Sequence, residues 1–155
     1  MSAHVPDNYD LAILRILQED ASRPQREIAQ QVNLSAPAVQ RRIAKMEKAG
    51  VIKRTIAIID PTSVGLPITI MVEVTLRDDR ATTVAEAKAF FASAREVQQC
   101  YWIAGVAGLM LVISVPTTEA YEQRTARLFG ENDLVKSYRT IVVLDRVKVG
   151  LALPI

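Results

Sequence analysis

Residues 24–54 decide the fold of the first third of the chain and read PQREIAQQVNLSAPAVQRRIAKMEKAGVIKR. Apolar residues recur at helical spacing in 24–32 and again in 36–48, which predicts two short amphipathic helices. Between them, Asn33–Ser35 has the composition of a tight turn. Two short helices joined by such a turn are typical of a helix-turn-helix.

The ends of the second of these helices also carry specific signals. Ser35 is a good N-cap, and Pro37 falls in the first turn, where its missing N–H costs little. Gly50 suits the C′ position after the last turn, and Val51 can fold back on Met46 in a Schellman closure. We therefore expect this helix to begin just after Ser35 and to end just before Gly50.

A third helix is predicted ahead of this pair, starting at Asp7 or Asn8 and ending near Asp20. Its expected buried stripe is Leu11, Leu14 and Leu17. The other two helices contribute the remaining predicted core, which is Ile28, Ala29, Val32, Val39, Ile43 and Met46. Three helices with this spacing predict one compact domain over residues 1–52.

The positive charge of the chain is concentrated near this motif. The net charge is only +2, and residues 61–155 contain ten basic and ten acidic residues. Between Arg41 and Arg54, however, six basic residues accompany the single acid Glu47. A surface that contacts DNA phosphates is expected to have such a concentration, although a solvated basic helix face has one too.

The remainder of the chain predicts a second domain of α+β class. Ile56–Ile59 has a strand pattern followed by the turn 60–63, so residues 53–66 are interpreted as a linking strand and turn. The pattern of residues 67–155 predicts six elements in the order strand, helix, strand, strand, helix and strand. They cover residues 68–76, 83–94, 97–104, 109–115, 118–130 and 134–144, and the last strand has an extension to Leu151. This βαββαβ order is ferredoxin-like. One face of such a sheet has no helices, so we expect a homodimer or a larger homo-oligomer.

The outward face of the predicted recognition helix has the residue types that read DNA. Gln40 can pair with adenine and Arg41 with guanine, while the small Ala36 and Ala38 allow close approach. The remaining expected contacts, mainly to phosphates, are Ser35, Pro37, Arg42, Lys45, Lys53 and Arg54. The alternative is a ligand-binding or oligomerising module whose helical part recruits protein.

The chain resembles the leucine-responsive regulatory protein/AsnC (Lrp/AsnC) family of transcription regulators over roughly residues 9–150. The resemblance rests on YDLAIL at 9–14, EIA at 27–29, LSAPAVQRRI at 34–43, GVI at 50–52, IDP at 59–61 and VQQCY at 97–101. It implies a winged-type helix-turn-helix and a ferredoxin-like domain that dimerises and often assembles to tetramers or octamers. It also implies control of amino-acid or nitrogen metabolism genes by a small effector, commonly an amino acid, bound where ferredoxin-like domains meet.

The second hairpin departs from the family pattern. The family usually has Gly-x-x-Asp followed by an aromatic residue, whereas this chain has Gly105-Val106-Ala107-Gly108-Leu109. By the resemblance, the missing carboxylate helps to define the amino-acid site, and a buried α-ammonium needs acceptors. Either the effector differs, other groups such as backbone carbonyls or Thr140 replace the carboxylate, or no effector binds. The expected effector residues are Ile103, Ala104, Gly105, Val106, Gly108 and Thr140, and the apolar tip Val106-Ala107 favours a turn buried against another subunit.

Catalytic and metal-binding arrangements are not predicted. His4 is the only histidine and lies in a start expected to be frayed, so no Ser-His or Cys-His pair is expected. Cys100, the only cysteine, is interpreted as a packed core thiol.

The longest apolar stretch, 101–115, is too short to span a bilayer, and no signal peptide is apparent. We therefore expect a cytoplasmic, non-enzymatic protein without metal or cofactor.

Overall fold

The computed structural model describes residues 4–105 and 108–155 and divides the chain into two compact units. The first unit extends to Ile58 and also includes Lys148–Ile155, and the second comprises Ile59–Val147.

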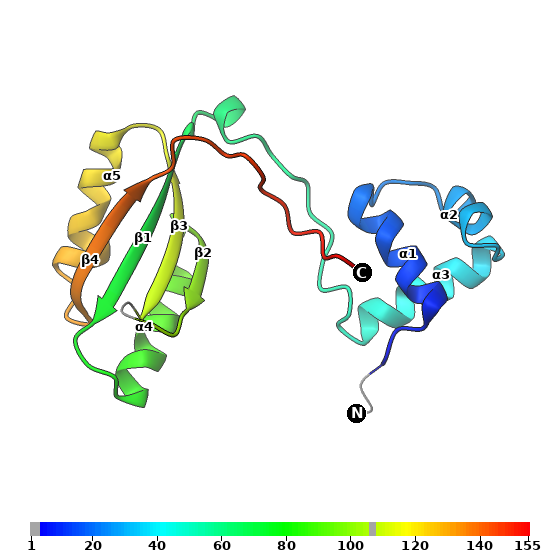
Figure 1. Ribbon diagram of the computed structural model, residues 1–155, viewed down its shortest axis with the longest axis horizontal. Helices are drawn as coiled ribbons and strands as arrows, with labels where there is room; N and C mark the ends of the chain where they lie inside the picture. The colour runs from blue at the N-terminus through cyan, green and yellow to red at the C-terminus, as the bar shows by residue number, and fades with distance from the viewer. Residues whose placement is uncertain (1–3, 106–107) are drawn as a thin grey trace. The chain divides into compact units, whose positions relative to one another are not determined.

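The first unit contains three helices, α1 (Asn8–Glu19), α2 (Gln25–Gln31) and α3 (Ala36–Lys48) (Figure 1). Each lies within a few residues of its predicted range. Their buried apolar side chains form one core, which consists of Ile13, Ile16, Ile28, Ala29, Val32, Val39 and Met46. Six apolar residues between 11 and 17 cover much of α1, so periodicity alone did not select the centre of the buried face. The predicted stripe Leu11, Leu14 and Leu17 was wrong in this respect, because these side chains are only half-buried.

Both ends of α3 are closed as the sequence predicted. The hydroxyl of Ser35 accepts a hydrogen bond from the backbone N–H of Ala38 at 3.3 Å. At the other end Gly50 has φ of +75°, and the N–H of Val51 donates to the carbonyl of Met46 at 2.9 Å. This Schellman closure requires the left-handed conformation that glycine adopts without strain.

The predicted linking strand is not formed. Residues 53–60 have no regular secondary structure, and Ile56, Ile58 and Ile59 are exposed. A strand needs a hydrogen-bonded neighbour, and none of the described residues pairs with this segment. The extension of the last strand toward Leu151 was wrong for the same reason.

Two residues of the C-terminal tail, Leu153 and Ile155, contact α1. The side-chain amide of Gln18 accepts from the N–H of Leu153 at 2.6 Å and donates to its carbonyl at 3.2 Å. The guanidinium of Arg15 donates to the carbonyl of Ile155 at 2.5 Å. These contacts group Lys148–Ile155 with the helical unit.

The second unit is a four-stranded antiparallel sheet with two helices, as predicted for a ferredoxin-like βαββαβ domain. Its elements are β1 (Ile68–Leu76), α4 (Ala81–Ser93), β2 (Val97–Trp102), β3 (Leu109–Val115), α5 (Thr118–Thr125) with a π-helical turn (Ala126–Gly130), and β4 (Val135–Val142). The strand order is β2-β3-β1-β4, and every neighbouring pair is antiparallel.

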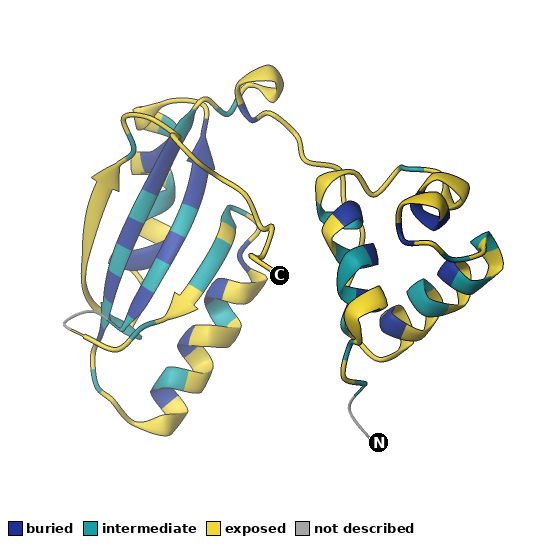
Figure 2. Cartoon of the chain, turned by 45° about the vertical axis from the view of Figure 1, so that its right-hand side comes forward, coloured by how far each residue is buried: buried dark blue, intermediate teal, exposed yellow. Residues whose placement is uncertain are grey.

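The core of this unit lies on one face of the sheet. Side chains alternate along β1 and β3 between this core and the other face, as the colour bands in Figure 2 show. Phe91 of α4 and Leu128 after α5 are completely buried against the core face. The register directs Met71, Val112 and Ile141 to the other face, where they take no part in this core.

Candidate functional site

The outward face of α3 presents most of the predicted DNA-contact residues. Gln40, Arg41 and Lys45 are exposed, while Val39 and Met46 on the opposite side of the helix are buried. The other predicted contacts at this helix and after it are Ser35 and Pro37, which are exposed, Ala36 and Ala38, which are half-buried, and Lys53 and Arg54, which are exposed. The packing of α3 therefore decides which of its polar side chains can reach a partner.

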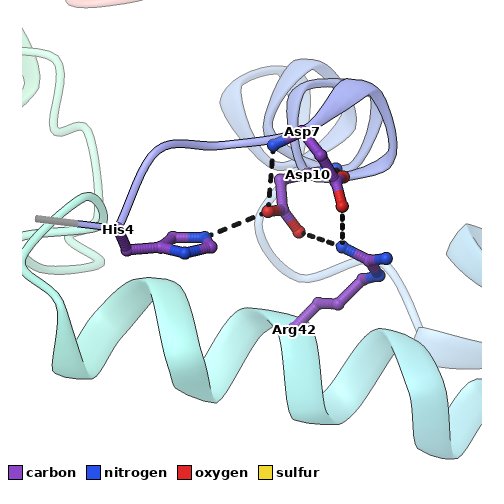
Figure 3. Close-up of polar contacts among 4 residues, drawn as sticks. All are labelled: His4, Asp7, Asp10 and Arg42. Carbon is purple, nitrogen blue, oxygen red and sulfur yellow. Dashed lines mark hydrogen bonds and ion pairs between the residues drawn. The ribbon is translucent and has the colours of Figure 1, made fainter. Parts of the chain in front are cut away.

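Arg42 is placed differently from its neighbour Arg41. Its Nη1 donates to Oδ2 of Asp7 at 2.8 Å and to Oδ1 of Asp10 at 2.7 Å (Figure 3). Its guanidinium carbon also lies 5.4 Å from the centre of the Tyr9 ring. The sequence analysis expected this side chain on a DNA phosphate, but in the structure it pairs with the first turn of α1.

Asp7 and Asp10 form a reciprocal cap at the start of α1. The carboxylate of Asp7 accepts from the N–H of Asp10 at 2.9 Å, and the carboxylate of Asp10 accepts from the N–H of Asp7 at 3.2 Å. His4 Nε2 lies 3.0 Å from Oδ2 of Asp10 (Figure 3). The burial of Asp10 was not predicted from the sequence, although Asp10, Ile13 and Ile16 follow one another at intervals of three residues, which was a usable signal.

The acidities of both carboxyls reflect these bonds. The N–H of Asp10, followed by Arg42, holds the pKa of Asp7 below its ordinary value. Burial by itself raises the pKa of Asp10, but hydrogen bonds from Arg42 and from the N–H of Asp7 outweigh it, and the net pKa is lowered. Both groups are therefore carboxylates at neutral pH.

The predicted effector hairpin joins β2 to β3. The N–H of Ile103 donates to the carbonyl of Gly108, and the N–H of Gly108 donates to the carbonyl of Val74, each at 3.0 Å. Ile103 is half-buried, Ala104 and Gly105 are exposed, and Gly105 has φ of +144°. Val106, and with it the expectation of a tip buried against another subunit, lies outside the described residues.

Thr140 is not at this hairpin within one chain. It lies on β4 opposite Val72, and β1 separates β4 from β3, so the two strands are roughly 10 Å apart. Its hydroxyl is 2.7 Å from the hydroxyl of Tyr121, whose pKa is raised by burial. Within one chain Thr140 therefore bonds to α5 and does not face the hairpin backbone.

The side chain that does lie at the hairpin is Trp102. A Cβ at Gly108 would come within 2.9 Å of Cζ3 of this indole, and the ammonium of Lys88 lies 5.1 Å from the ring centre. This contact between Trp102 and Gly108 was not predicted from the sequence. A large aromatic residue on the strand before a glycine-containing hairpin was the available signal.

Other site chemistry is limited. In the parts of the chain that the structure describes, no group of three or more His, Cys, Asp and Glu residues could hold a metal ion. Cys100 is half-buried against the core of the second unit, and burial raises the pKa of its thiol. Over the same residues, no helix is both long enough and apolar enough to cross a membrane.

Comparison with known families assigns both units. Residues 6–53 match the winged helix-turn-helix DNA-binding family, and residues 69–153 match the Lrp/AsnC ligand binding domain. The chain belongs to the Lrp/AsnC family. An uncharacterised HTH-type transcriptional regulator of Sinorhizobium fredii is 38% identical over 149 residues, which cover 96% of this chain and 88% of that protein.

Solved structures of the Lrp/AsnC family have the same fold. An AsnC family regulator from Agrobacterium tumefaciens superposes with a TM-score of 0.89 at 29% identity, covering 96% of this chain and 97% of that one. A Neisseria meningitidis regulator solved as an L-Met complex gives a TM-score of 0.88 at 24% identity, covering 97% of each chain. The relatives are named transcriptional regulators, so this Lrp/AsnC protein is a DNA-binding regulator with a ligand-binding domain and not an enzyme.

Proposed function

We propose that this protein regulates genes of amino-acid or nitrogen metabolism by binding specific DNA sites, under the control of a small effector. The observation that carries the DNA-binding part is the outward face of α3. Gln40, Arg41 and Lys45 are exposed there, while the core side chains Val39 and Met46 hold the opposite face. The N-terminal residues of a recognition helix reach base edges in the major groove.

The roles of the individual side chains follow from their chemistry and position. Gln40 is assigned to adenine and Arg41 to guanine, because each can form two hydrogen bonds with that base. Ala36 and Ala38 allow close approach to the groove. Contacts with the DNA backbone are assigned to five other residues at the start of α3, along it and beyond its end. These are Ser35, Pro37, Lys45, Lys53 and Arg54.

The protein acts as a homodimer or a larger assembly, up to a tetramer or octamer. Two surfaces support self-association, and the first is the sheet face opposite α4 and α5, with Met71, Val112 and Ile141. The second is formed by two segments without regular secondary structure that expose apolar side chains, which are Ile56, Ile58 and Ile59 and, in the tail, Val147, Val149, Leu151 and Leu153. A two-fold dimer would place two α3 helices on two half-sites of one operator.

The effector binds at the hairpin between β2 and β3, where Ile103, Ala104, Gly105 and Gly108 come together. By resemblance to the family it is an amino acid, bound where two such domains meet. The effector can change DNA binding only if it has a higher affinity for one assembly than for another. Backbone carbonyls of the hairpin are then the acceptors for an α-ammonium, because position 108 has no carboxylate.

A second class of effector is favoured by one observation. Gly108 is covered by the indole of Trp102, and the ammonium of Lys88 lies 5.1 Å from the centre of that ring. This corner of the domain offers positive charge and an aromatic surface. A carboxylic acid without an α-ammonium, such as a 2-oxo acid, matches this chemistry better than a zwitterion does.

The test is the affinity of the full-length protein for the DNA upstream of its own gene. It is measured alone, with a pool of the common amino acids, and with a pool of the corresponding 2-oxo acids. A change with the first pool supports an amino-acid effector, and a change with the second pool alone supports the other class. Tight binding that ignores both pools would contradict effector control, and absence of binding at low salt would favour a protein-recruiting role for the helices.

The matched control is Arg41→Ala. It removes a proposed DNA contact at an exposed position, so DNA affinity should fall while the oligomers persist. Oligomeric state is measured by sedimentation with and without the active pool. Strong, salt-dependent DNA binding by the Arg41→Ala variant would show that the site is elsewhere.

A further inference from the structure

Two adjacent arginines of α3 have different electrostatic surroundings. Arg41 is exposed, and no acidic group among the described residues lies within 4.0 Å of its nitrogens. Arg42 has two carboxylates within 2.8 Å of one nitrogen, and its side chain is 30% exposed. The two residues therefore cannot have the same role, although they are neighbours of the same type.

The group that holds Arg42 is itself buried. The side chain of Asp10 is 2% exposed, and its two oxygens are occupied by Arg42, by the N–H of Asp7 and by His4 (Figure 3). Withdrawing Arg42 toward a phosphate would leave this carboxylate in the interior without its charged partner. An unpaired buried charge is strongly destabilising, so the pair opposes release of the arginine.

The local charge also argues against contact with DNA. Asp7, Asp10 and Arg42 together have one net negative charge, and a phosphate is not attracted to such a group. The same bonds connect the N-cap and first turn of α1 to the middle of α3, across 35 and 32 residues of sequence. The guanidinium carbon of Arg42 also lies over the ring of Tyr9, 5.4 Å from its centre.

We propose that Arg42 is a positioning residue that fixes the rotation of α3 on α1 through Asp7 and Asp10, and that Arg41 makes the DNA contact. Rotation of a helix decides which of its side chains face outward, and one residue step corresponds to about 100°. Loss of the pair would therefore misplace Gln40 and Arg41 without removing a phosphate contact. The inference rests on the proposed contact of α3 with DNA.

The experiment compares Arg42→Met with the matched variant Arg41→Met in the full-length protein. Two duplexes of equal length are used, one selected by the wild-type protein from a random library and one of unrelated sequence. Affinities are measured by fluorescence anisotropy between about 50 and 200 mM KCl, because the salt slope counts phosphate contacts. Failure of the wild-type protein to select any sequence from the library would overturn the proposed function, whereas the variants test only the inference.

Arg42→Met should weaken binding to the selected duplex by about tenfold or more, with an unchanged salt slope and an unchanged affinity for the unrelated duplex. Arg41→Met should also weaken binding to the selected duplex and lower discrimination against the unrelated one, because it removes the proposed contact with guanine. A slope that falls for Arg42→Met, with equal losses on both duplexes, would overturn the inference.

Asp7→Asn keeps the proposal testable if Arg42→Met fails to fold. Asparagine is as good an N-cap as aspartate, so the helix start is preserved while the charge is removed. If Arg42 is a positioning residue, Asp7→Asn weakens binding to the selected duplex although it removes a negative charge. If Arg42 contacts phosphate, the same change frees the guanidinium, and unchanged or tighter binding results. Circular dichroism establishes that each variant is folded before the comparison.

Discussion

The indole of Trp102 lies directly over the backbone of Gly108. A Cβ at position 108 would be 2.9 Å from Cζ3 of the ring, closer than Cβ atoms of folded proteins approach other atoms, and 3.4 Å from Cη2. The lack of a side chain at Gly108 therefore creates the space in which this ring lies. The hairpin that departs from the family pattern thus has its own packing partner.

Gly108→Ala should displace the indole without unfolding the domain. The clashing atoms are the far end of a side chain that is 47% exposed, so the ring can move, and the loss of stability should be about 1 kcal/mol or less. Trp102 is the only tryptophan, so its fluorescence emission reports the change directly and should shift to the red. The control is Gly130→Ala, where a Cβ meets only a carbonyl oxygen at 3.9 Å. An emission spectrum identical to that of the wild-type protein would contradict the packing described.

Met46→Ala should destabilise the helical unit by about 2–5 kcal/mol, because it empties a completely buried position in its core. The helical signal in circular dichroism should melt at a lower temperature, while Trp102 fluorescence reports the second unit and should not shift. Lys45→Ala, exposed on the same helix, is the control and should change stability by no more than about 0.5 kcal/mol. A parallel shift of the fluorescence transition would mean that the two units unfold together.

Gln40→Ala should relax sequence discrimination and leave general affinity intact. A side chain that pairs with adenine contributes about 1–3 kcal/mol to the choice of base, and glutamine has no charge for a phosphate. Selection of random duplexes by the wild-type and variant proteins, followed by sequencing, measures the effect. Gln30→Ala, exposed on α2, should select the wild-type site. The assignment fails if the Gln40→Ala variant also selects an unchanged site.

The helical unit should lose stability in acid through Asp7 and Asp10. Both pKa values are below their ordinary values in the folded state, so the unfolded chain takes up protons first as the pH falls. The stabilisation is complete above about pH 4 and is lost as the pH drops through the lowered values. Urea unfolding followed by circular dichroism from about pH 7 to pH 3 measures the loss. The Asp10→Asn variant should be less stable at neutral pH and should show a smaller decline in acid, and an equal decline would assign the effect to other carboxyls.

Much of the fold could be predicted from local sequence patterns. The helix ends at Ser35 and Gly50 depend on contacts within a few residues, and both were predicted correctly. The strands β1 and β3 were also predicted, and in β1 the alternation of apolar residues has the period of a strand whatever the rest of the chain does. The βαββαβ order then leaves few possible sheet topologies.

The failures have a common physical origin. Ile56–Ile59 has the composition of a strand but lacks a hydrogen-bonded neighbour among the described residues. The buried line of α1 runs through Ile13 and Ile16 because that side faces the other helices, which its own periodicity does not specify. In both cases the outcome depends on residues that are distant in sequence.

The sequence by itself determined the class of the protein, with its three helices, its ferredoxin-like unit and the basic surface after residue 40. Only the tertiary structure decided which arginine is available to a ligand and which residue occupies the space at Gly108. Local patterns depend on backbone hydrogen bonds and on periodicity over a few residues. The partner of a charged or aromatic side chain depends on which distant groups folding brings within contact, as Asp7 and Asp10 are brought to Arg42 and Trp102 to Gly108.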